Sequence, residues 1–160
     1  MNPALSNLLE LWRAQGITLR AGASEDAISS FESRYGVRLP LDYREFLLHT
    51  DGLDSDDTVT KYWSISDLRP ATEVFDGTDI ATMCLVLPSR LSHPDSYFVF
   101  ADALIWSHFY AIQLGAIPES GGQVAWIGYR DSWTAAESFT EFMQCYVAKP
   151  QQADWIGAKR

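Results

Sequence analysis

Basic residues and cysteines are scarce in this sequence. Its 160 residues include 12 lysines and arginines against 21 aspartates and glutamates, so the net charge is −9. Proteins that hold nucleic acid by its phosphates need basic patches, so we expect no nucleic-acid partner. The acidic charge serves solubility, and it also suits a basic protein partner. Cys84 and Cys145 lie far apart without Cys-x-x-Cys spacing, which favours buried thiols in a reducing compartment over a disulfide.

Targeting signals and membrane-length apolar runs are also missing. The start at Met1 is followed by neither the basic residues nor the apolar run of a signal peptide. No apolar stretch is long enough to span a bilayer. We therefore expect a cytoplasmic protein that does not insert into a membrane. The length and the hydrophobic content of 47% suit one domain over residues 1–160 with a substantial core.

No pattern of catalytic or metal-ligating residues stands out. One acidic run has the side chains that calcium prefers, but neither of its registers supplies the glycine and glutamate of an EF-hand loop. A solvated loop is the better interpretation of this run, which contains Asp51, Asp54, Asp56 and Asp57. The histidines lack ligand spacing, and neither a nucleophile elbow nor a glycine-rich phosphate loop occurs. We expect no metal, no cofactor and no catalytic residue; an enzyme with an unrecognised site stays open as a third alternative.

Three amphipathic helices are predicted in the first 52 residues. Apolar residues at helical spacing between Leu5 and Trp12 indicate the first. Ser24 is a suitable N-cap for the second, which Gly36 ends. The third is predicted to start at Leu39-Pro40 and to stop before Gly52.

Strands and one closing helix are predicted in the rest of the chain. Ser138 and Glu141 have the spacing of a capping box, so they open a helix within about 135–148, followed by a tail over 150–160. Alternating or continuous apolar residues indicate the strands, and a short helix is predicted near Pro70; the segments are 58–65, 66–74 (the helix), 97–101, 108–114 and 123–129. The short links predict an α+β fold: a largely antiparallel twisted sheet flanked by the N-terminal helices and one C-terminal helix.

The segment from Ser24 to Gly52 resembles the N-terminal signature of the SUKH superfamily. The resemblance rests on Phe31-Glu32, the Gly36 break, Leu39-Pro40, Asp42-Tyr43, Glu45-Phe46-Leu47 and the acidic residue before Gly52. The predicted closing helix is similar to the one that ends the family's domain. The superfamily includes the yeast cell-wall-assembly regulator and many bacterial immunity proteins that neutralise polymorphic toxins. The resemblance implies a non-catalytic protein-binding domain.

Two binding functions follow from this resemblance. The first is an immunity protein that binds and blocks a basic toxin domain, and the alternative is a regulatory scaffold that binds a host factor. The acidic side chains of Asp54, Asp56 and Asp57 cluster, so we expect them to steer a basic partner. Tyr62 follows closely and is predicted to anchor the same partner, since tyrosine is enriched at interface hot spots.

Overall fold

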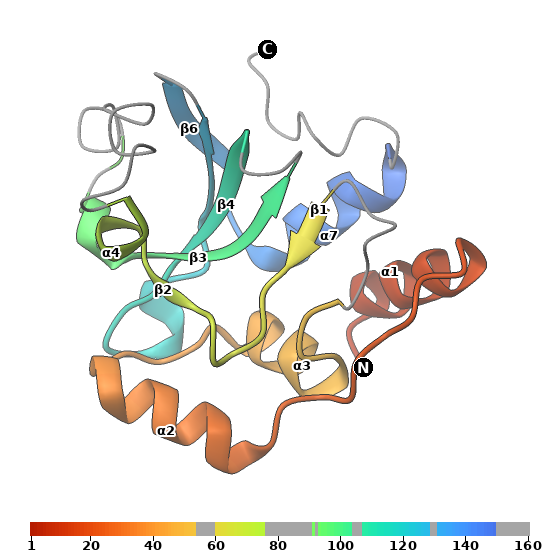
Figure 1. Ribbon diagram of the computed structural model, residues 1–160, viewed down its shortest axis with the longest axis horizontal. Coiled ribbons are helices and arrows are strands. Elements are labelled where there is room, and N and C mark those ends of the chain that lie inside the picture. The colour runs from red at the N-terminus through yellow and green to blue at the C-terminus, as the bar shows by residue number, and fades with distance from the viewer. Residues whose placement is uncertain (54–59, 76–90, 92, 104–106, 129–130, 150–160) are drawn as a thin grey trace.

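A computed structural model describes residues 1–53, 60–75, 91, 93–103, 107–128 and 131–149 (Figure 1). The helices of this part are α1 (Pro3–Ala14), α2 (Glu25–Tyr35), α3 (Leu41–His49), α4 (Ala71–Phe75) and α7 (Phe139–Ala148), with the 3-10 helices η1 (Pro94–Ser96) and η2 (Pro118–Ser120). The strands are β1 (Thr60–Tyr62), β2 (Arg69–Pro70), β3 (Tyr97–Ala103), β4 (His108–Gln113), β5 (Val124–Gly128) and β6 (Asp131–Ala136). None of the described helices is long and apolar enough to cross a membrane.

The strands form one six-stranded sheet in the order β1-β3-β4-β5-β6, and β2 also pairs with β3. Every pairing is antiparallel, as the short links predict. The register of β3 shifts at Phe100, between the Val99–Ala111 and Ala101–Tyr110 pairs. Apolar residues on both sides of the segment 108–114 indicate a central strand, and this is confirmed, because β4 lies between β3 and β5 and is buried along both faces.

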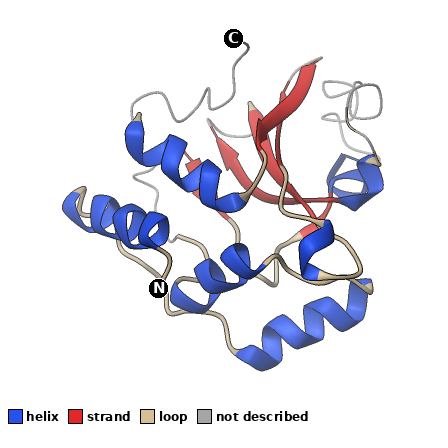
Figure 2. Ribbon diagram, turned by 180° about the vertical axis from the view of Figure 1, so that it is seen from behind, coloured by secondary structure: helices blue, strands red, loops and turns tan. Residues whose placement is uncertain are grey.

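Helices cover the sheet unequally. On one face, the rings of Phe100 and Tyr110 pack against Phe142 of α7, with ring centroids 5.5 and 5.1 Å away. Figure 2 shows this face with its helices in front of the strands. On the opposite face, Phe75 of α4 packs edge-to-face on Phe109 at 5.0 Å. We call these the helical face and the α4 face. The predicted α+β fold with N-terminal helices and one C-terminal helix is confirmed.

The predicted helix ends are confirmed in most details. The Ser24 hydroxyl accepts the Ala27 N–H at 3.1 Å, and Gly36 ends α2 with a φ of 65°, a conformation that suits glycine. The Ser138 hydroxyl accepts the Glu141 N–H at 3.1 Å and caps α7. One difference is small: Pro40 caps α3 from outside, and the helix begins at the next residue.

The observed strands and α4 differ from the sequence prediction in three places. The strand predicted over 58–65 ends at Tyr62 in its described part; Tyr62 turns towards the helical face and Trp63 towards the α4 face. The helix predicted over 66–74 is divided, since Pro70 lies in β2 and α4 follows it. β6 was not predicted, because Asp131-Ser132-Trp133 and two alanines show neither β-branched residues in number nor clean alternation.

Other predictions fall on residues that the structure does not describe. The sequence also indicates a turn at Asp76-Gly77 and a short apolar run over 83–87; both lie outside the described residues, as do Cys84 and the tail over 150–160.

Candidate functional site

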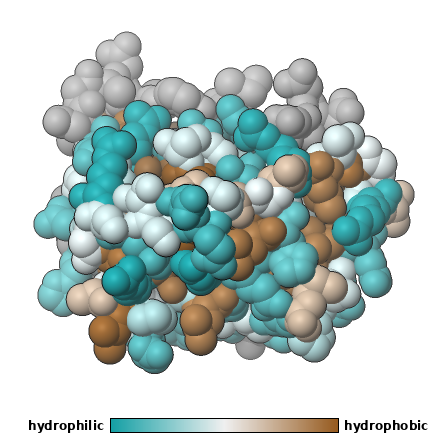
Figure 3. All heavy atoms as spheres, turned by 90° about the horizontal axis from the view of Figure 1, so that it is seen from below, coloured by the Kyte–Doolittle hydropathy of each residue, from teal (hydrophilic) through white to brown (hydrophobic). Residues whose placement is uncertain are grey.

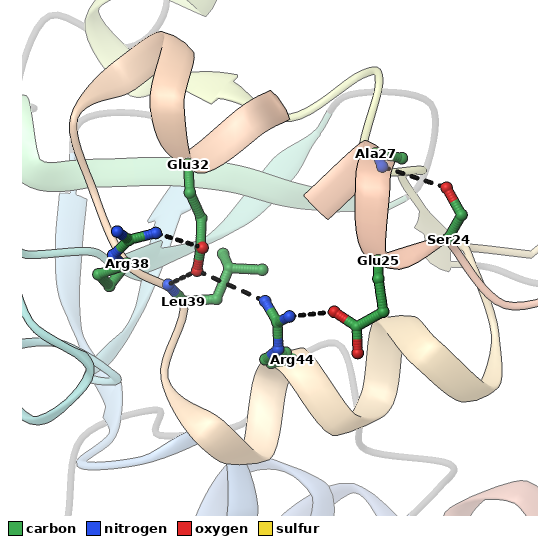
Figure 4. A network of polar contacts seen from close by, with 7 residues as sticks. All are labelled: Ser24, Glu25, Ala27, Glu32, Arg38, Leu39 and Arg44. Atoms are coloured by element: carbon green, nitrogen blue, oxygen red, sulfur yellow. Dashed lines mark hydrogen bonds and ion pairs between the residues drawn. The ribbon is translucent and has the colours of Figure 1, made fainter. Parts of the chain in front are cut away.

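Several polar residues of the Ser24–Gly52 segment contact one another around the buried Glu32 (Figure 4). Glu32 of α2 is buried, and its Oε1 accepts the backbone N–H of Leu39 at 2.9 Å. Its Oε2 accepts a bond from Arg38 Nη1 at 2.8 Å, and Arg44 Nη1 lies 3.7 Å from Oε1. Arg44 also pairs with Glu25 at the start of α2. Glu32 therefore ties the α2–α3 link to both helices.

Other signature side chains join α3 to the first and last described segments, the residues just before α1 and the start of α7. Asp42 Oδ2 accepts the backbone N–H of Thr140 at 2.7 Å and its hydroxyl at 2.9 Å. Glu45 Oε1 accepts the backbone N–H of Asn2 at 3.0 Å. Asn2 in turn donates to the Thr140 hydroxyl at 2.8 Å. Asp42 and Glu45 therefore stabilise the packing of α3 against both of these segments.

The predicted partner-binding residues are not gathered on a described surface. Asp54, Asp56 and Asp57 lie outside the described residues. Tyr62 is only 1% exposed and contacts the Trp12 ring at 5.0 Å, so its prediction as an exposed anchor does not fit its position. Burial raises the pKa of the Tyr62 phenol well above its usual value, and the nearby phenols of Tyr146 and Tyr110 add to that shift. Tyr62 is a core residue.

Residues with metal-binding or nucleophilic chemistry do not converge in the described part of the chain. No group of three or more histidine, cysteine, aspartate or glutamate side chains there is placed to hold a metal ion. His49 contacts the Glu45 carbonyl through Nδ1 at 2.9 Å, and His108 stacks on Trp126 in the sheet. Cys145 is a free, half-buried thiol on α7.

The α4 face carries a pocket of about 290 Å³. Its inner wall is Asp102 of β3, whose carboxylate accepts the indole N–H of Trp63 at 2.6 Å. Two basic side chains also line the pocket, Lys61 of β1 and Arg69 of β2. The guanidinium carbon of Arg69 lies 5.8 Å from the Trp63 ring centroid. The remaining lining residues are Asp67, Glu73 and Val74. We call this the Trp63 pocket; the elements that form it, β1, β2, β3 and α4, can be followed in Figure 1.

Sequence reasoning missed the Trp63 pocket. Asp102 lies 39 residues from Trp63, and only the β1–β3 pairing, in which Lys61 is opposite Asp102, brings them together. An aspartate inside an apolar strand was the one available signal, because a charged residue seldom lies in a strand that is buried on both faces.

A second hollow, of about 300 Å³, lies between the start of α3 and η2. Its lining includes Pro40, Asp42, Pro118 and Gly122, and two large apolar side chains near it are exposed, Leu41 by 69% and Ile117 by 57%. Figure 3 views the molecule from below and shows apolar residues in separate groups among polar ones. No continuous apolar interface is visible on that face.

No curated protein matches the chain. The model of the SMI1 / KNR4 family (SUKH-1) matches residues 22–145, which include the signature, the whole sheet and most of α7. The chain therefore belongs to the SMI1 / KNR4 family (SUKH-1).

Proposed function

We propose that this protein is a non-catalytic binding domain that neutralises a bacterial toxin by occupying it. The observation that carries the proposal is the family match over residues 22–145. The SUKH superfamily contains bacterial immunity proteins together with the yeast cell-wall-assembly regulator. Glu32 supports a non-catalytic role, because its buried carboxylate is already engaged by the Leu39 N–H and the Arg38 guanidinium.

Charge supports a basic partner. The chain carries a net charge of −9, and opposite charge accelerates the encounter between two proteins. A basic toxin domain, such as a nuclease whose surface must attract phosphates, has the complementary character. Asp54, Asp56 and Asp57 stay our candidates for steering this encounter.

Capture followed by rescue tests the proposal. The tagged protein is used to isolate partners from the native organism, and each captured protein is then expressed with and without this chain in a sensitive host. An immunity function predicts one captured protein that is toxic alone and harmless when this chain is present. Capture only of non-toxic host factors would favour the regulatory scaffold instead and would contradict the proposal.

Charge reversal tests the role of the acidic segment. The triple variant D54K/D56K/D57K should associate with the toxin about tenfold more slowly at low salt, and the difference should shrink as salt screens the charges. A matched control reverses three exposed acids elsewhere, Glu10, Asp26 and Asp95. Equal slowing in both variants would show that net charge alone matters and that the segment has no special role.

A further inference from the structure

Asp102 is a buried carboxylate that forms no ion pair with any described residue. It is 5% exposed, and the indole N–H of Trp63 is the donor that it receives. No lysine, arginine or histidine nitrogen of the described residues lies within 4.0 Å of its carboxylate. Removing a carboxylate from water is costly unless a positive group or several donors compensate it. One hydrogen bond uses only part of its capacity, so Asp102 is suited to receive a further cationic donor from the pocket.

The Trp63 ring forms a wall of the same pocket that already accepts a guanidinium. The Arg69 guanidinium carbon lies 5.8 Å from the ring centroid, within the range of a cation–π contact. Arg69 is exposed, and the only hydrogen bond from its side chain to a described residue runs from Nε to the Asp67 carbonyl at 3.4 Å. So weakly held a side chain can be displaced by a second guanidinium.

The volume and the lining charges of the Trp63 pocket limit the kind of ligand that it can bind. A pocket of about 290 Å³ is at the lower end of ligand sites, which suits one side chain better than a cofactor. Three of its charged residues are acidic, Asp67, Glu73 and Asp102, and two are basic. Lys61 is opposite Asp102 in the β1–β3 register, yet it is exposed and its ammonium does not reach the carboxylate. A planar guanidinium can both pair with a carboxylate through two N–H groups and stack on an indole, which an ammonium cannot.

We propose that the Trp63 pocket receives an arginine side chain of the protein partner, with Asp102 as its carboxylate acceptor and Trp63 as its stacking surface. The inference rests on the proposed function for the existence of a basic partner. It adds the chemistry of the contact and the place on the fold, the α4 face between β1, β2 and α4.

A small arginine analogue tests the pocket without the partner. N-acetyl-arginine amide is titrated into the full chain, and the indole N–H signal of Trp63 is followed by NMR. That signal is first assigned by correlating it with the carbon shifts of Trp63. We expect saturable movement of this signal with a midpoint on the order of 1 mM, as suits so small a ligand. N-acetyl-citrulline amide, which has the same shape without the charge, should move it far less. Equal response to both analogues, or to acetate instead, would overturn the proposal.

Three variants sharpen the test. Asp102→Asn keeps an acceptor for the Trp63 indole and should weaken arginine-analogue binding by about tenfold. Arg69→Ala removes the competing guanidinium and should strengthen binding by about threefold. Asp95→Asn, an exposed acid in η1, should leave the midpoint unchanged. An unchanged midpoint in Asp102→Asn, or weaker binding in Arg69→Ala, would contradict the assignment.

The captured partner separates this inference from the proposed function. If the Asp102→Asn variant binds the captured toxin as tightly as the native chain does, the immunity function is supported and the proposed arginine pocket is contradicted. If the arginine analogue binds as predicted but no captured protein is toxic, the proposed pocket is supported and the immunity function is contradicted.

Discussion

Glu32 and Leu39 are joined by a hydrogen bond across the α2–α3 link. Glu32 Oε1 accepts the Leu39 N–H at 2.9 Å, and both residues are buried. This N–H has no place in a helix, because it precedes α3 by two residues, so the carboxylate satisfies a donor that would otherwise be buried alone. The Phe31-Glu32 and Leu39-Pro40 parts of the signature are therefore coupled physically: the acid of one part fixes the chain direction of the other.

Substitution of Glu32 should destabilise the whole domain. Glu32→Gln removes the charge from a buried site that faces Arg38 and leaves an amide group next to other donors. We expect a loss of about 2–4 kcal/mol in the free energy of unfolding, measured by urea denaturation. Glu25→Gln is the matched control: Glu25 pairs with Arg44 at an exposed position, so it should cost less than about 1 kcal/mol. Equal costs for the two variants would refute the structural role of Glu32.

The contact between Asp42 and Thr140 should couple α3 to α7. Asp42 Oδ2 accepts both the backbone N–H and the hydroxyl of Thr140. That N–H lies in the first turn of α7, where no intrahelical acceptor exists. Asp42→Ala should therefore cost about 2–3 kcal/mol and Thr140→Val about 1 kcal/mol in unfolding free energy.

A double-mutant cycle checks this coupling. Because both variants break the bond between carboxylate and hydroxyl, the double variant should cost less than the sum by about 1 kcal/mol. Strict additivity would show that the two side chains act separately.

Gly22 should be intolerant of even one methyl group, although it is exposed. A Cβ at this position would overlap the carbonyl group of Leu48 at the end of α3. The neighbouring residue holds the segment close, since the Ala23 N–H donates to the Leu47 carbonyl at 2.8 Å. Gly22→Ala should cost about 1–3 kcal/mol through this forced displacement, measured by thermal or urea unfolding.

Gly16 provides the comparison for Gly22. A Cβ at Gly16 meets nothing within 4 Å, but its φ of 74° disfavours alanine. Gly16→Ala should lower the free energy of unfolding by about 1–2 kcal/mol through backbone strain alone. In the same unfolding measurement, Gly22→Ser should destabilise the protein at least as much as Gly22→Ala. An unchanged stability in Gly22→Ala would contradict the prediction, because it would show that the segment can move away from α3.

The helices near the two ends of the described chain were predictable from sequence, whereas the pairing and facing of the strands between them were not. The N-cap residues Ser24 and Ser138 predict the starts of α2 and α7, because a helix cap depends only on residues within one turn. The sequence did not show which residues of β1 face the helices, because both faces of the sheet are covered. Tyr62 packs under α1 and α7 and Trp63 lies in the pocket, so apolar residues on either side carry no direction.

The candidate pocket was out of reach for a related reason. A cap or a helix stripe is local, but Asp102, Trp63 and Arg69 meet only through the pairing of β1 and β2 with β3. Sequence reasoning chose the acidic cluster at Asp54–Asp57 because its members are neighbours in the chain. A carboxylate recruited from a different strand leaves no spacing to recognise.

Alkaline pH should unfold the domain through two buried phenols. Burial raises the pKa of Tyr43 well above its usual value, with the Asp51 carboxylate adding to the shift, and burial also raises the pKa of Tyr62. In the unfolded chain both phenols lose their protons near a pH of about 10. Above that pH the folded state holds protons that the unfolded state releases, so stability falls as pH rises, by about 1.4 kcal/mol per pH unit for each phenol.

Phenylalanine substitutions isolate this effect. Neither hydroxyl has a hydrogen-bond partner in the described part of the structure, so Tyr43→Phe and Tyr62→Phe should change stability at neutral pH by less than about 1 kcal/mol. Urea unfolding from pH 8 to 11 should then show a shallower loss of stability in each variant, and the shallowest in the double variant. Parallel curves for the native and double-variant proteins above pH 10 would mean that both phenols ionise within the folded state.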